Sequence, residues 1–251
     1  MAGKHKGCEK KLSDPRLTLI SNRFEDIDKV IAVSSGKGGV GKSLLSVALA
    51  FCLRDKGKRV GLLDLDFTSP STHVILGARD LYPEEEKGIK PPEYKGLSYM
   101  SIVYYSADNP VPLRGADTSD AIIELLAITR WEKLDYLVID MPPGIGDATL
   151  DMLRLIPRIS FLVVTTPSIL AYESVRKLLS LLKDQNIPII GVVENMVMKS
   201  SSFIRSQVED EKLRFLGSID YDDTLENSLG NPDKLRETKF YKQLAKISAG
   251  I

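Results

Sequence analysis

Residues 35–43 read SGKGGVGKS and combine four glycines with two lysines and two serines. The spacing Gly36-x-x-x-x-Gly41-Lys42-Ser43 is typical of a phosphate-binding loop. Glycines let the backbone curl until its N–H groups point at a phosphate, and the N-terminus of a following helix favours the same negative charge. We expect Lys42 to contact the β- and γ-phosphates and the Ser43 hydroxyl to bind Mg²⁺. The residues expected to hold the nucleotide here are Gly36, Gly38, Gly39, Val40, Gly41, Lys42, Ser43 and Leu44.

The second lysine of the loop, Lys37, lies five residues before Lys42. We expect that Lys37 cannot fold back onto the γ-phosphate of its own subunit while its backbone lines the loop. It could reach a nucleotide held by a second subunit, where a cation stabilises the charge that develops during phosphoryl transfer. Lys37 therefore predicts a face-to-face homodimer with ATP between the subunits. The alternative is a solvated surface lysine.

Three aspartates end apolar runs that have the composition of strands. Asp140 closes DYLVIDM and precedes a Pro-Pro-Gly turn, whereas Asp64 and Asp66 close RVGLLDLD. The carboxyl ends of parallel strands meet at one edge of a sheet, where ligands of open α/β folds bind. We expect Asp140 to hold Mg²⁺ through water at this edge. Asp64 and Asp66 are two residues apart, so they would share one face of a strand; Asp66 could instead cap the next helix.

Seven short apolar runs alternate along the chain with helical patterns such as 43–57 and 169–185. Most runs are apolar almost continuously, as in strands that are covered on both faces. The runs are 30–35, 59–66, 97–105, 135–141, 160–166, 187–196 and 213–220. This order predicts an α/β fold, with a mostly parallel central sheet of about seven or eight strands flanked by helices on both faces. Residues 78–96 are expected to form a long loop.

The composition places limits on location and partners. We interpret residues 1–27 as a flexible N-terminal tail and residues 28–251 as one ATPase domain. Lys plus Arg and Asp plus Glu both number 34, so net charge predicts neither a nucleic-acid nor a membrane partner. No apolar run approaches about 18 residues, and the N-terminus lacks an apolar signal segment. We expect a cytoplasmic protein.

The loop KGGVGKS resembles the deviant Walker A loop of the MinD/Mrp/ParA ATPases. Residues 61–71, 131–147, 162–168 and 187–196 resemble sequence blocks of the Mrp-like branch, in the same order. The resemblance implies Mg²⁺-dependent ATP hydrolysis, with Asp64 supporting the Mg²⁺ shell and Asp66 orienting the attacking water. It also implies a switch segment that senses the γ-phosphate, formed by Pro142, Pro143, Gly144 and Asp147.

The base is expected to be adenine. Guanine-specific relatives carry Asn-Lys-x-Asp after a strand, and this chain has no such tetrapeptide. Asn195 follows the corresponding run, and an asparagine amide can pair with the N6 and N7 edge of adenine. Asn195 could instead act as a turn former.

The cysteine pattern indicates which metal cargo the ATPase is expected to serve. Mrp-like iron–sulfur carriers usually have Cys-x-x-Cys shortly after the Glu-Asn-Met block, and serines stand there in this chain. Cys52 lies among apolar residues and is expected to be a buried core thiol. The chain thus resembles most closely the archaeal ATPase-type maturation proteins of nickel–iron hydrogenase. This predicts a metallochaperone ATPase that inserts nickel with a small nickel/zinc-binding maturation protein.

An iron–sulfur cluster carrier and a MinD/ParA-type positioning ATPase remain alternatives. In the tail, His5 and Cys8 could contribute to a nickel or zinc site in a dimer. The same two residues could be incidental in a disordered tail.

Overall fold

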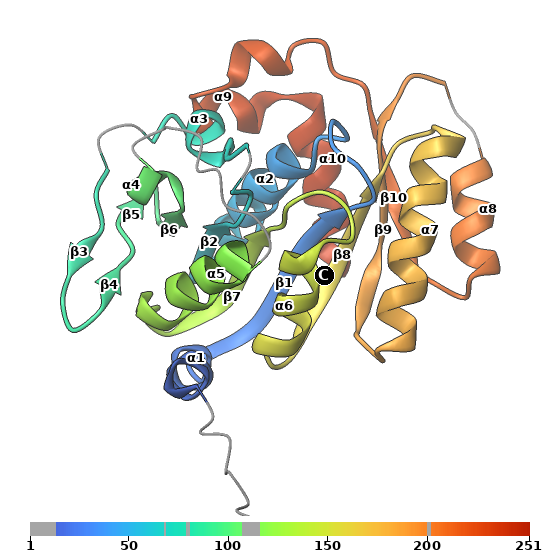
Figure 1. Ribbon diagram of the computed structural model, residues 1–251. Helices are drawn as coiled ribbons and strands as arrows, with labels where there is room; N and C mark the ends of the chain where they lie inside the picture. The colour runs from blue at the N-terminus through green and yellow to red at the C-terminus, as the bar shows by residue number, and fades with distance from the viewer. Residues whose placement is uncertain (1–13, 68, 79–80, 107–115, 200–201) are drawn as a thin grey trace, which may run out of the picture.

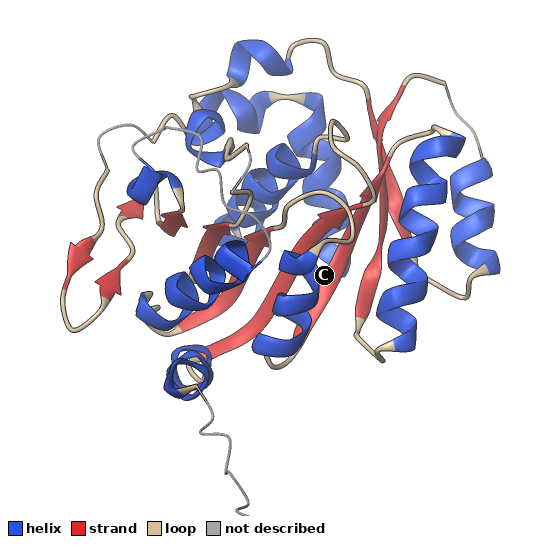
Figure 2. Ribbon diagram, viewed as in Figure 1, coloured by secondary structure: helices blue, strands red, loops and turns tan. Residues whose placement is uncertain are grey.

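The central sheet has eight strands in the order β10-β9-β8-β1-β7-β2-β6-β5 (Figures 1 and 2). The structure is a computed structural model and describes residues 14–67, 69–78, 81–106, 116–199 and 202–251. All neighbouring strands pair in parallel except β5 and β6. The strands are β1 (Ile27–Ser35), β2 (Val60–Asp64), β5 (Glu93–Tyr94), β6 (Leu97–Ser101), β7 (Leu134–Asp140), β8 (Ile159–Thr165), β9 (Ile189–Val197) and β10 (Phe215–Asp220). The expected α/β fold is confirmed.

Helices cover both faces of the sheet, as Figure 1 shows. One layer contains α2 (Lys42–Asp55), α3 (Thr72–Leu76), α9 (Pro232–Glu237) and α10 (Lys239–Ile247). The other contains α5 (Ala116–Ile128), α6 (Asp147–Leu155), α7 (Ile169–Asp184) and α8 (Phe203–Asp210). The described residues also form the short helical turns α4 (Val103–Ser106), η1 (Leu225–Ser228) and η2 (Ser248–Gly250). None of the helices in the described ranges is both long and apolar enough to cross a membrane.

The continuous apolar runs arise because a central strand contributes side chains to the core on both faces of the sheet. In β1, Val30 and Ala32 belong to the core under α5–α7, while Ile31 and Val33 belong to the core under α2. Successive side chains of a strand point to opposite faces, so a strand covered twice is apolar at every position. This packing holds the carboxyl ends of β1, β2 and β7 in register at one edge of the sheet.

The expected tail boundary at residue 27 is wrong for part of the segment. Residues Pro15–Phe24 form helix α1, which contacts α5 and buries Ile20 and Phe24. Asp14 caps this helix by accepting the N–H of Arg16, and Pro15 occupies its first turn. Ile20 and Phe24 are four residues apart and therefore lie on one face of the helix. Residues 1–13, with His5 and Cys8, lie outside the described residues.

The segment 78–106 also differs from expectation. Instead of the long loop expected over residues 78–96, its described part contains the antiparallel pair β3 (Glu84–Glu85) and β4 (Ile89–Lys90), and then β5 at the sheet edge. The expected strand 97–105 ends at Ser101, because residues 103–106 turn into α4. Short edge strands carry little apolar pattern, since packing covers them only partly.

Candidate functional site

A cleft of about 590 Å³ opens at the carboxyl edge of the sheet, above the start of α2. The phosphate loop forms its floor, and the end of β9 and segments after β2, β7 and β10 form its walls. Its lining residues are Ser35, Lys37, Gly38, Gly39, Gly41, Lys42, Ser43, Leu44, Asp66, Ser69, Ser71, Ile75, Pro143, Met196, Tyr221, Asp222, Asp223, Leu225, Glu226 and Leu229. The structure thus brings most of the predicted loop residues, Lys37 and Asp66 to one cavity.

The loop backbone requires its glycines at three positions. Gly39 and Gly41 have φ values of 77° and 81°, in the left-handed region that favours glycine. A Cβ on Gly36 would lie 2.5 Å from the backbone of Ser174 in α7, so only glycine fits there. Val40 is buried beneath the loop. Helix α2 then begins at Lys42, with the Leu45 N–H bonded to the Gly41 carbonyl.

Lys42 and Asp140 form a buried ion pair. The Lys42 ammonium lies 2.7 Å from Asp140 Oδ1, and the Ser46 hydroxyl donates to the same oxygen at 2.8 Å. Lys42 also lies 3.3 Å from the Ser43 hydroxyl. The second oxygen of Asp140, Oδ2, is buried and has no hydrogen-bond partner among the described residues. Buried polar atoms normally have a partner, so this oxygen fits the expected role of holding Mg²⁺-bound water.

Asp64 is fully buried and anchors the loop that follows β2. Its Oδ1 accepts the Asp66 N–H at 3.0 Å, and its Oδ2 accepts the Thr72 hydroxyl at 2.6 Å and the Thr72 N–H at 3.2 Å. Tyr99 in turn hydrogen bonds Thr72 at 2.8 Å. Both Asp64 oxygens are therefore occupied by protein donors. Its expected contribution to the Mg²⁺ shell stays a prediction, and its observed role is to position Asp66.

Burial and the nearby Asp140 carboxylate raise the pKa of Asp64 from 3.8 to about 7. The folded state then binds this proton more tightly than the unfolded state, so Asp64 makes the protein less stable as pH rises between these values. We expect Asp64→Asn to remove this part of the pH dependence. Urea unfolding at pH 5 and 7.5, without nucleotide or Mg²⁺, measures the difference. If the free energy of unfolding depends on pH identically in both proteins, Asp64 is not the source of this effect.

Asp66 lies on the loop after β2 and not on the strand, so the expected shared strand face is wrong. Its Oδ1 accepts the N–H of Ser69 at 3.1 Å, and its side chain lines the cleft although only 6% of the residue is exposed. The hydrogen bond from the Asp66 N–H to Asp64 fixes the backbone at this point of the loop. A carboxylate at the cleft wall fits a residue that orients water, which remains a prediction.

Lys37 is exposed at the rim of the cleft. Its carbonyl accepts the Ser35 hydroxyl at 2.9 Å, which fixes the backbone and leaves the side chain in solvent. This geometry fits both the reach to a second subunit and the alternative of a surface lysine.

The switch segment connects to the phosphate loop through the backbone. The Gly144 N–H donates to the Ser35 carbonyl at 2.9 Å, and Gly144 has a φ of 85°. Pro143 lines the cleft, directly after Pro142 in the chain. Asp147 is the first residue of α6. A change at the γ-phosphate could therefore pass through Gly144 to α6, which is consistent with the predicted switch.

Asn195 holds the phosphate loop in place. Its amide donates to the Val40 carbonyl at 2.9 Å, and only 3% of the residue is exposed. One donor of the amide is thus already used, and the contact with adenine stays a prediction. Near the expected base, Met196 and Tyr221 line the cleft instead.

Sequence reasoning missed Ser46, Thr72 and the segment Tyr221–Asp223. Ser46 lies one helical turn after Lys42, and that spacing could have indicated its contact with Asp140. Thr72 and residues 221–223 reach the site only through folding of the chain, so no local pattern marks them.

Cys52 is buried in α2, as expected. Burial raises the pKa of its thiol to about 11, so the thiolate that binds metals is strongly disfavoured.

Known proteins are similar to this chain in sequence. An iron–sulfur cluster carrier protein from Pseudomonas fragi is 42% identical over 177 residues, covering 69% of this chain and 62% of that protein. The carrier from Escherichia coli is 40% identical over 198 residues, covering 76% of this chain and 54% of that protein. The chain therefore spans only about half to 62% of these relatives' lengths.

Solved structures share the fold. A nucleotide-binding protein from Archaeoglobus fulgidus in complex with ADP superposes with a TM-score of 0.75 at 29% identity, covering 88% of this chain and 93% of that chain. The cell division ATPase MinD of Pyrococcus furiosus gives 0.67 at 23% identity, covering 89% and 98%, which supports the fold alone. Residues 26–247 match the family model described as NUBPL iron-transfer P-loop NTPase, and the chain belongs to this family.

Proposed function

We propose that the protein is a Mg²⁺-dependent ATPase that switches a nucleotide-sandwich homodimer. The observation that carries this proposal is the buried Lys42–Asp140 pair, in which Asp140 Oδ2 has no hydrogen-bond partner within the described part of the chain. Incoming ATP would draw Lys42 onto the phosphates, and water bound to Mg²⁺ would donate to Asp140 Oδ2. Asp66 would orient the attacking water. Hydrolysis of ATP would then open the closed dimer.

Lys37→Ala is expected to keep nucleotide binding within about threefold and to lower turnover at least about 100-fold, because a missing cation at the transferring phosphoryl group costs this much or more. Calorimetric titration with a non-hydrolysable ATP analogue measures binding, and light scattering measures dimerisation. Lys242→Ala, an exposed lysine on α10, is the matched control. Normal turnover by monomeric Lys37→Ala protein would contradict the in-trans role.

We further propose that the ATPase serves iron–sulfur cluster transfer, as the names of its relatives suggest. In this proposal the cluster is cargo, and the chain itself offers few thiolates that could bind it. The chain has only Cys8 and Cys52, and Cys52 is buried with a thiol that resists ionisation. Fe–S clusters are held mainly by thiolates. A partner protein would therefore supply most cluster ligands, while ATP controls its docking.

Reconstitution tests this ligand assignment. Anaerobic incubation of the protein alone with iron and sulfide is expected to leave no cluster after desalting, measured by visible absorbance and iron content. A stoichiometric cluster that survives desalting would show that the chain supplies its own ligands.

Nickel insertion into a hydrogenase is the second candidate, and the missing thiolate pair favours it. In that case a small nickel/zinc-binding maturation protein would carry the metal.

Capture of partners separates the two candidates. Tagged Asp66→Asn protein, expected to remain closed with ATP, would be purified anaerobically from its own organism and its partners identified by mass spectrometry. Iron–sulfur assembly factors or apo-clients would support cluster transfer, whereas a nickel protein or hydrogenase precursor would support the second candidate. Recovery of chromosomal or membrane proteins alone would overturn both and favour a positioning ATPase.

A further inference from the structure

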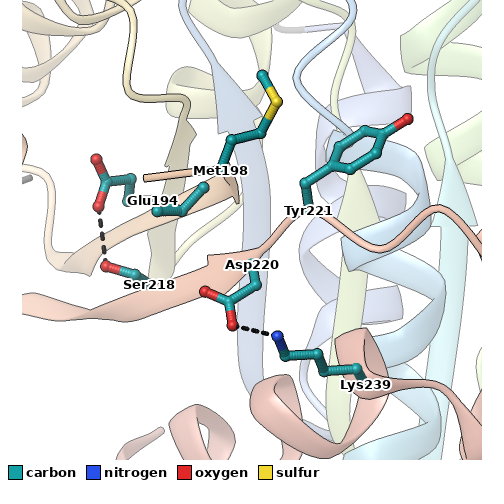
Figure 3. A pocket seen from close by; sticks show the side chains of 7 residues that line it. Glu194, Met198, Ser218, Asp220, Tyr221 and Lys239 are labelled. Carbon is teal, nitrogen blue, oxygen red and sulfur yellow. Dashed lines mark hydrogen bonds and ion pairs between the residues drawn. The ribbon is translucent and has the colours of Figure 1, made fainter. Parts of the chain in front are cut away.

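A second cavity, of about 440 Å³, lies beside the nucleotide cleft at the carboxyl ends of β9 and β10. Its lining residues, shown in Figure 3, are Glu194, Val197, Met198, Ser218, Asp220, Tyr221 and Lys239. Tyr221 borders both cavities, but the other six residues do not line the nucleotide cleft. None of the proposed steps of ATP hydrolysis uses this cavity.

The cavity contains a buried carboxylate that is only half satisfied. Glu194 is 1% exposed, and its Oε2 accepts the Ser218 hydroxyl at 2.8 Å. Its Oε1 is buried and has no hydrogen-bond partner among the described residues. A buried charged oxygen without a donor is costly, so it is expected where a ligand completes the site.

The other charges of the cavity compensate one another. Lys239 lies 2.6 Å from Asp220 Oδ2, and Gln243 donates to the same oxygen at 3.0 Å (Figure 3 draws the ion pair). The guanidinium of the nearby Arg205 lies over the ring of Phe215, 4.9 Å from its centre. Burial raises the pKa of Glu194, and the Ser218 hydrogen bond and the nearby Arg205 charge oppose this shift only in part. Arg205 donates no hydrogen bond to Glu194 Oε1 among the described residues, so the carboxylate still favours a cationic donor over an anion.

The donors available do not suit a metal ion. The described part of the chain holds no group of three or more His, Cys, Asp or Glu residues that could bind one. An ammonium or guanidinium ion needs fewer partners, because it donates hydrogen bonds to a carboxylate directly. Beside Glu194, Met198 is 81% exposed and Tyr221 is 55% exposed. These side chains could cover the alkyl stem of an amine or contact its charge through the aromatic ring.

We propose that this cavity binds an alkylammonium or guanidinium group, whose charge is held by the Glu194 carboxylate and whose stem packs against Met198 or Tyr221. The group belongs either to a free amine or to a lysine or arginine side chain of another protein. This site is independent of the proposed ATPase cycle, so either proposal can fail alone.

Methionine methyl NMR at pH 8 can test the proposal, because Met198 lines this cavity and Met196 lines the nucleotide cleft. The protein would carry ¹³C-methyl methionine, with the Met198 signal assigned by Met198→Leu. The probes are butylammonium chloride, the peptide acetyl-Gly-Lys-Gly-amide and its neutral norleucine counterpart. Both charged probes should shift Met198 saturably and leave Met196 unchanged, whereas the norleucine peptide should not shift Met198.

The variants are chosen for charge. Glu194→Gln should weaken binding at least about tenfold, because it removes a charge-assisted hydrogen bond. Glu209→Gln is the matched control, because Glu209 is an exposed carboxylate on α8; this variant should bind as the unmodified protein does. Lys239→Met should strengthen binding about threefold, because it frees the Asp220 charge. Lys239 is 60% exposed, so this variant keeps the test valid if Glu194→Gln does not fold.

The two charged probes distinguish a free amine from a protein side chain as the origin of the bound cationic group. A peptide that binds at least about tenfold tighter than butylammonium indicates a partner side chain, and equal affinities indicate a free amine; both support the site. The proposal is overturned if neither charged probe shifts Met198, if the norleucine peptide binds equally well, or if Glu194→Gln binds unchanged.

Discussion

Asp140→Ala is expected to lower the free energy of unfolding by about 3–5 kcal/mol, because it leaves the buried Lys42 ammonium without its counter-ion. Lys42 is 7% exposed and Asp140 is fully buried, so solvent replaces little of the lost contact. The same change is expected to lower ATP hydrolysis at least about 100-fold, since the Mg²⁺ shell loses its protein carboxylate. Urea unfolding and a phosphate-release assay measure the two effects separately.

A double variant separates stability from chemistry. Lys42→Met with Asp140→Leu replaces the pair by apolar side chains, and such replacements of buried ion pairs are often neutral for stability. We expect most of the lost stability to return while ATP hydrolysis stays absent. If the double variant is as unstable as Asp140→Ala, the ion pair is not the source of the effect.

Asp66→Asn is expected to lower kcat by about 10²- to 10⁴-fold with little change in ATP affinity, because the attacking water would lose the carboxylate proposed to orient it. The asparagine carbonyl can still accept the Ser69 N–H, so the loop should keep its conformation. Single-turnover hydrolysis and calorimetric titration with ATP give the two quantities.

Asp184→Asn provides the matched control, because Asp184 is an exposed carboxylate at the end of α7 and does not line the cleft. It should hydrolyse ATP at nearly the original rate. An unchanged kcat in Asp66→Asn would instead support the alternative in which Asp66 only caps its loop.

The sequence alone predicted the features that local chemistry specifies. The phosphate loop was recognisable because glycines with positive φ, a lysine and a hydroxyl must stand at set spacings before a helix. The strands were recognisable because a doubly covered strand is apolar at nearly every position. Asp140 could be placed at the carboxyl edge because a parallel strand ends there.

Helix α1 was missed because its apolar face is short, and its burial depends on α5, about a hundred residues later in the chain. The nickel assignment likewise rested on an absence of cysteines. The relatives instead favour iron–sulfur cluster transfer, and a missing residue carries less information than about 40% identity along the domain.

Only the tertiary structure decided what several polar residues do. Asp64 and Asp66 look equivalent in the sequence, yet Thr72 and Tyr99 enclose the first and leave the second at the cleft. Asn195 stands at a strand end where a base was expected, and its amide is bound to Val40. Sequence determines which groups are present at the sheet edge, because strand ends are local. Their partners come from distant segments, so only packing determines which oxygen remains unpaired.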